Sequence, residues 1–185
     1  MPRSPSDARA RHRPRPAVII IVALAGFAVA AASSMAGVRS FTLRVVKNVH
    51  VDNTALAKSG IPVAAMVNKH ETVVVGSTGY AVYTFKGETT HPLHIICKKT
   101  SSTATNCWGF WPPVSVTSAK RISAQRGVKG KLGTFRNHGM LQLTLNGHPL
   151  YYFTPDLMSG KKRAASGDQL KTFGSTWSIV TPGSH

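Results

Sequence analysis

Four short runs of β-forming residues, broken by turn residues, lie in the chain after residue 71 and predict strands with little helix. The strand-forming runs are residues 72–75, 80–85, 140–145 and 150–154. Gly76-Ser77-Thr78-Gly79 separates the first two runs, and Asn146-Gly147-His148-Pro149 separates the last two. Because such turns tolerate positive φ angles, each pair predicts a β-hairpin. The one helical signal is a short turn near Asn53 to Ser59.

A longer apolar run near the N-terminus predicts export. Ala17 to Ala32 has no charge or amide and follows an arginine-rich head, which is the order of a signal peptide. Small residues offer cleavage after Ala32 or Ala36, but the apolar segment is also long enough for an uncleaved anchor. We therefore expect residues 1–36 to form an apolar helix that acts as a signal peptide or signal anchor. The remainder would be extracellular or on the outer face of the cytoplasmic membrane.

The two hairpins have matching residues at a constant offset. Tyr83 matches Tyr151, Phe85 matches Phe153 and Glu88 matches Asp156, each 68 positions on (151 minus 83, 153 minus 85, 156 minus 88). The spacing predicts two copies of one supersecondary unit packed into a small all-β domain. The expected organisation is a linker and lead-in at 37–71, then a domain at 72–182 with repeats at 72–116 and 140–182.

At these residues the chain resembles an exported repeat family of predicted lipoproteins with a Y-x-[FWY]-x-x-D motif, common in actinobacteria. Tyr151-Tyr152-Phe153-Thr154-Pro155-Asp156 matches the motif fully, whereas the first copy has Glu88 in place of the aspartate. The resemblance implies an exported envelope protein of unassigned chemistry. No cysteine directly follows the apolar segment, so the lipid attachment typical of many relatives is not expected here.

The motif residues have a structural interpretation. Tyrosine and phenylalanine two apart on a strand share a face, so Tyr83 with Phe85 and Tyr151 with Phe153 are expected in the core. Asp156 is expected to cap a turn by accepting backbone N–H bonds. Two interpretations stay open for the tryptophans, an exposed stacking surface or a packed corner. These are Trp108, Trp111 and Trp177.

The two cysteines predict a disulfide. Cys97 and Cys107 are an even pair in the exported part of the chain, where thiols are oxidised. The competing interpretation is a zinc site formed by His91, His94, Cys97 and Cys107. However, Pro92 and the β-branched residues after His94 favour an extended segment, in which residues three apart point to opposite faces.

Composition bears on partners more than on catalysis. After residue 36 the chain has 18 Lys and Arg against five acids, which gives +13. Such a charge favours an anionic membrane surface or a cell-wall polymer, and no nucleic-acid motif is present. No catalytic or cofactor motif is present either, so a non-enzymatic protein without a cofactor is expected. The leading hypothesis is an envelope protein that binds an anionic component; the alternative is an electron-transfer or metal-handling accessory.

The mature N-terminus tests the export hypothesis. Mass spectrometry of the protein from its natural host should find it outside the cytoplasm, starting after Ala32 or Ala36, or held in the membrane with its leader intact. A soluble cytoplasmic form that still carries Met1 would contradict export.

Overall fold

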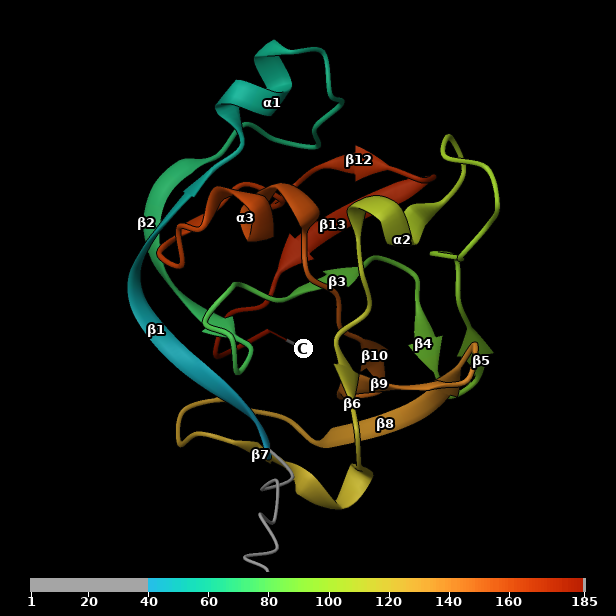
Figure 1. The fold of residues 1–185 in the computed structure, drawn as a ribbon. Helices are drawn as coiled ribbons and strands as arrows, with labels where there is room; N and C mark the ends of the chain where they lie inside the picture. Colours follow the sequence, from blue (N-terminus) through green and yellow to red (C-terminus); the bar gives the residue numbers. More distant parts are fainter. Residues whose placement is uncertain (1–39, 185) are drawn as a thin grey trace, which may run out of the picture. The chain divides into compact units, whose positions relative to one another are not determined.

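The computed structural model describes residues 40–184, and strands predominate over helices there (Figure 1). This confirms the expected all-β class. The strands are β1 (Phe41–Asp52), β2 (Asn68–Val75), β3 (Tyr83–Phe85), β4 (Thr89–Thr90), β5 (Leu93–His94), β6 (Ser115–Val116), β7 (Ile122–Ala124), β8 (Leu132–Asn137), β9 (Met140–Leu145), β10 (His148–Pro149), β11 (Ala164–Ala165), β12 (Lys171–Thr172) and β13 (Ser175–Ile179). The helices are α1 (Thr54–Lys58), α2 (Cys107–Phe110), α3 (Thr154–Ser159) and a 3-10 turn at Ala119–Arg121. α1 confirms the short helical turn expected at this position.

The predicted leader, residues 1–36, lies outside the described residues. Within residues 40–184, no helix is long and apolar enough to cross a membrane.

β1 belongs to the β-rich unit, which corrects the expectation that residues 37–71 are a linker. The strand lies beside β2, with which it pairs antiparallel (Figure 1), and it pairs parallel with β7 and β11. Its Leu43, Val49 and Val51 have no exposed surface. A segment with so much buried apolar surface is stabilised in a sheet, whereas a linker would expose those side chains to water.

The predicted Asn-Gly turn is present, but its second strand differs from the expected run 150–154, because β10 covers His148–Pro149 and Thr154 begins α3. Asn146 and Gly147 have φ angles of 52° and 79°, and they join β9 to β10 with Leu145 opposite His148. Both positions of this two-residue turn lie in the left-handed region, which asparagine and glycine adopt most readily. A second hairpin, which the sequence reasoning missed, joins β8 to β9.

The first predicted hairpin is shorter than expected. The N–H of Val82 donates to the carbonyl oxygen of Val74, but from Tyr83 onward the chain leaves β2. β3 pairs with β13 instead, where Phe85 lies opposite Trp177 and the two rings stack with centroids 4.2 Å apart. Burying these aromatic rings against each other lowers the free energy of the fold, which favours the pairing of β3 with β13 over a longer pairing with β2.

Alternation along the strands sorts the apolar side chains into two core clusters. Val73 and Val75 of β2 lie in one cluster, whereas Val74 lies in the other. In the same way Tyr83 lies in the first cluster and the preceding Val82 in the second. Because successive side chains point to opposite faces of a strand, one strand contributes to both cores. The first cluster also holds the cysteines, Tyr83 and Phe85 of the first motif segment, and Tyr151 and Phe153 of the second.

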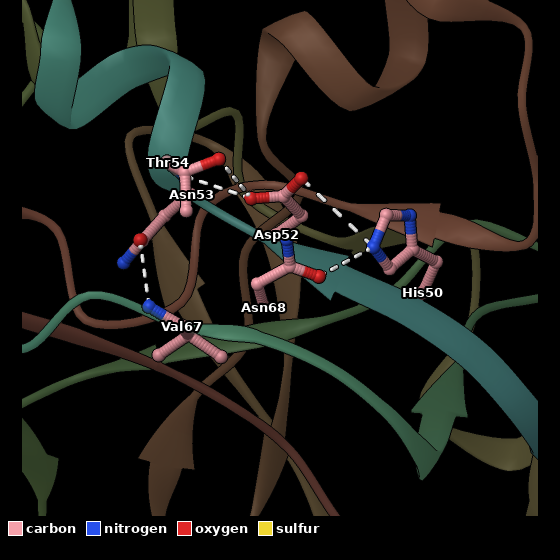
Figure 2. A network of polar contacts seen from close by, with 6 residues as sticks. All are labelled: His50, Asp52, Asn53, Thr54, Val67 and Asn68. Atoms are coloured by element: carbon pink, nitrogen blue, oxygen red, sulfur yellow. Dashed lines mark hydrogen bonds and ion pairs between the residues drawn. The ribbon is translucent and has the colours of Figure 1, made fainter.

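A buried asparagine holds the junction between β1, α1 and β2 (Figure 2). The Asn53 side chain has no exposed surface. Its amide nitrogen donates to the carbonyl oxygens of Ala65 and Asp168, and its amide oxygen accepts from the N–H of Val67. Since Asp168 lies far along the chain, this one side chain ties the N-terminal strand pair to the segment before β12.

The surface side of the same junction is polar. The Asp52 carboxylate accepts from the N–H and the hydroxyl of Thr54, and these hydrogen bonds hold the pKa of Asp52 below its usual value (Figure 2). The His50 ring is hydrogen-bonded to Asn68 across the β1–β2 pair at 2.9 Å. The His50–Asn68 contact aligns the two strands, and the part-buried Asp52–Thr54 contacts hold the start of α1.

Candidate functional site

The two motif tyrosines pair through their backbones. The N–H of Tyr83 donates to the carbonyl oxygen of Tyr151, and the N–H of Tyr151 donates to that of Tyr83, both at 2.9 Å. This antiparallel bridge places β3 beside the segment between β10 and α3. Two segments that are distant in sequence therefore lie next to each other in the core.

Each tyrosine hydroxyl is hydrogen-bonded to the acid of the other motif segment. Tyr83 donates to the carboxylate of Asp156 at 2.6 Å, and Tyr151 donates to the carboxylate of Glu88 at 2.7 Å. Each tyrosine thus bonds the acid that follows the other tyrosine. All four side chains are buried, with at most 4 % of their surface exposed.

The second oxygen of each carboxylate holds a downstream loop. Glu88 accepts from the N–H groups of Ile96 and Cys97 at 2.7 and 2.6 Å. Asp156 accepts from the N–H and the hydroxyl of Ser166 at 2.9 and 2.7 Å. Asp156 therefore does not cap the adjoining turn as expected, because its N–H donor lies ten residues on in the chain. The reason is its burial, which turns the carboxylate away from its own turn and into the core.

Burial also changes the proton affinities of these groups. Loss of water around the carboxyls raises the pKa of Glu88 and of Asp156, and the hydrogen bonds that they accept offset only part of the rise. Burial likewise raises the pKa of Tyr83 and Tyr151, and the neighbouring acids raise it further. The phenols therefore keep their protons and act as donors. Buried in this way, the four groups crosslink the core and have no surface on which a substrate could lie.

A stack of aromatic rings lies against the two tyrosines, Tyr83 meeting Trp111 and Tyr151 meeting Trp177 edge to face. Trp111 and Trp177 stack with centroids 3.7 Å apart and an interplanar angle of 4°. Phe153 extends the stack from Trp111 and Phe85 extends it from Trp177. Trp111 and Trp177 are almost completely buried, so for these two the packed-corner interpretation is correct. Both indole N–H groups donate to the hydroxyl oxygen of Thr172, at 3.2 and 3.0 Å.

Cys97 and Cys107 form the predicted disulfide, with their Cα atoms 5.3 Å apart. The bonded sulfurs are not available as thiolate ligands, and His91 and His94 lie on the exposed β4–β5 hairpin. Among residues 40–184, no group of three or more His, Cys, Asp or Glu side chains could hold a metal ion. The geometry therefore does not assemble the four-residue zinc site that the sequence left open.

A cavity of about 710 Å³ lies against the disulfide and the outer side of the aromatic stack. Its walls come from α1, the loop closed by the disulfide, α2 and the segment around β12. Most of the lining side chains are apolar, and among the described residues Lys98 is the only charged one in the lining. Volumes of 300 to 1,000 Å³ with a mostly apolar lining are usual for small-molecule sites.

The outer surface is strongly basic. Six of the 23 Lys and Arg residues lie in 1–39, and the remaining 17 are all exposed. Of the five acids in residues 40–184, three are buried, namely Glu88, Asp156 and Asp168. The buried acids are hydrogen-bonded inside the molecule, so the charge presented to solvent is almost entirely positive.

Comparisons of the chain with protein-family models, with curated proteins and with solved structures gave no match. The resemblance of residues 151–156 to the Y-x-[FWY]-x-x-D family therefore stays an expectation from the motif itself.

Sequence reasoning found the motif residues but missed their partners. The 68-residue offset relates the two tyrosines and also the two acids. It could therefore have suggested that each tyrosine bonds the acid of the other segment. Nothing in the sequence points to Thr172 as the acceptor for two indoles, or to the close approach at Gly167. A Cβ there would lie 2.8 Å from Trp111 and 3.0 Å from Tyr83, so a glycine is needed at this position.

Removal of one carboxylate should destabilise the fold strongly. Asp156→Ala leaves the Tyr83 hydroxyl and the Ser166 N–H without an acceptor in the core, so we expect the free energy of unfolding in urea to fall by about 2–4 kcal/mol. Glu88→Ala should have a similar effect. Asp52→Ala removes a surface acid and should cost under about 1 kcal/mol. An equal loss of unfolding free energy in the buried-acid and surface-acid variants would contradict the role of the tyrosine–carboxylate hydrogen bonds in stability.

The raised carboxyl pKa values also predict a pH dependence. The folded protein holds these protons more tightly than the unfolded chain, so their contribution to stability is complete below about pH 4 and is lost as the pH rises through the folded pKa values. In denaturation at several pH values, wild type should therefore lose stability from about pH 4 upward relative to a Glu88→Gln, Asp156→Asn variant. Parallel curves of unfolding free energy against pH for the two proteins would contradict the raised pKa values of Glu88 and Asp156.

Proposed function

We propose that the chain is an exported, non-catalytic protein that binds an anionic component of the cell envelope through its exposed basic side chains. The observation that carries this proposal is the separation of charge between interior and surface. Internal hydrogen bonds hold three of the five acids of residues 40–184 in the core, while all 17 bases lie outside. A surface of one sign attracts polyanions and anionic lipids through many weak contacts.

Bases from separate segments converge on the turn after β2. A Cβ at Gly79 would lie 3.1 Å from the Lys162 side chain and 3.8 Å from the Arg44 guanidinium. Arg44 belongs to β1, whereas Lys162 lies in the basic run just before β11, which pairs with β1. Arg44 also donates to the carbonyl oxygen of Ser77 at 3.3 Å, which holds its guanidinium at this turn. These two cations form the most specific anchor that we assign for an anionic group.

We further propose that the binding module contains two copies of one unit, residues 72–116 and 140–182, as in the exported family that it resembles. The support is the reciprocity of the contacts. The paired backbones of Tyr83 and Tyr151 and the exchanged acids Glu88 and Asp156 follow the same 68-residue offset (151 minus 83, 156 minus 88). Such reciprocity is what the packing of two related units face to face would produce.

Binding to anionic envelope material should fall steeply with salt. Exposed contacts are screened over about 8 Å at physiological ionic strength, and each base near an anionic surface contributes about 1 kcal/mol. In co-sedimentation with anionic vesicles or cell-wall polymer, we expect Arg44→Gln and Lys162→Gln each to weaken binding about two- to fivefold at low salt. Neutral vesicles should not bind.

Matched changes separate this proposal from its alternative. Lys58→Gln removes the same charge from α1, which follows the end of β1 far from Arg44, and should weaken binding less than Lys162→Gln. A metal-handling or electron-transfer accessory would instead depend on His91, His94 or the cysteines. Retention that ignores salt, together with a bound metal that His94→Ala removes, would overturn the polyanion proposal.

A further inference from the structure

The cavity beside the disulfide has features that the basic surface does not explain. It is lined mainly by apolar side chains, and its edge includes Ile61 and Phe110, which are 36 % and 52 % exposed. Phe110 lies near Phe173 of the same lining, with ring centroids 6.2 Å apart. Large apolar side chains left in contact with water beside a cavity indicate a binding surface.

The polar groups of the lining are nearly all engaged within the protein. The hydroxyls of Thr100 and Thr105 are hydrogen-bonded to each other at 2.9 Å, and that of Thr172 accepts from two indoles. Lys98 differs, because within residues 40–184 its ammonium group forms no ion pair, and no acid lines the cavity. The lining thus combines an apolar interior with one available positive charge.

We propose that this cavity binds an amphiphile with an apolar body and a single anionic head group. The apolar body lies against Phe110 and the aromatic stack, and the head group pairs with the Lys98 ammonium. The disulfide contributes by holding the loop that carries Lys98, Thr100 and Thr105. This site is separate from the polyanion surface, because its affinity comes largely from apolar burial, which salt does not screen.

The test is calorimetric titration of the full-length protein at about 0.15 M salt, where weak surface contacts are screened. The probes share one chain and differ in head group: dodecanoate and dodecyltrimethylammonium, both below micelle formation, with inorganic phosphate as a head group alone. We expect saturable binding of one dodecanoate, about tenfold weaker binding of the cationic amphiphile, and no binding of phosphate.

Substitutions locate the site. Lys98→Gln should weaken dodecanoate binding about five- to tenfold and leave the cationic amphiphile unaffected or bound more tightly, whereas Lys161→Gln, the same charge loss outside the cavity, should change neither. Phe110→Ala should weaken both amphiphiles about three- to tenfold, whereas Met158→Ala, at another exposed apolar residue, should not.

The outcomes separate this proposal from the function proposed above. No saturable dodecanoate binding, equal binding of the two amphiphiles, or equal losses from Lys98→Gln and Lys161→Gln would overturn the amphiphile site. None of these results would affect the salt-sensitive binding of envelope polymers. Loss of polymer binding in Arg44→Gln and Lys162→Gln with intact dodecanoate binding would show that the two sites act independently.

Discussion

A buried carboxylate destabilises a protein unless hydrogen bonds replace the water that it loses, and in this chain two such carboxylates determine how the core is assembled. Glu88 and Asp156 each need donors, and each takes one from the tyrosine of the other motif segment. This requirement brings Tyr83 and Tyr151 together, and the backbone bridge between them follows. The aromatic stack and the disulfide loop then pack around that pairing.

The same constraint links the interior to the surface. Each carboxylate uses its second oxygen to hold a loop: Glu88 holds the start of the disulfide loop at Cys97, and Asp156 holds the segment at Ser166. The disulfide loop also forms part of the boundary of the cavity and carries Lys98. With three of the five acids of residues 40–184 buried, only Asp52 and Glu71 remain to offset the 17 bases of these residues, so the positive surface results from internal packing as well as composition.

The two proposed binding sites follow from the positive surface and from the cavity beside Lys98. A surface with one sign of charge suits extended anionic partners and responds to salt, because its contacts are solvent-exposed. The cavity suits a small amphiphile, because its contacts are apolar and depend on a single charge at Lys98. Both sites rest on a core that the buried tyrosine–carboxylate pairs hold in one arrangement.

The sequence by itself determined the local features: the all-β class, the turn at Asn146 and Gly147, the short helix after Asn53 and the cysteine pairing. These depend on turn chemistry, side-chain alternation and the compartment expected for the thiols, all of which are readable over a few residues. The sequence also predicted that Tyr83 and Tyr151, and their acids, match at a constant offset. Only the tertiary structure decided that β3 pairs with β13, that β1 joins the sheet, that the acids exchange partners, and that a cavity opens beside Lys98. Those outcomes depend on which distant surfaces bury one another, and no local pattern contains that information.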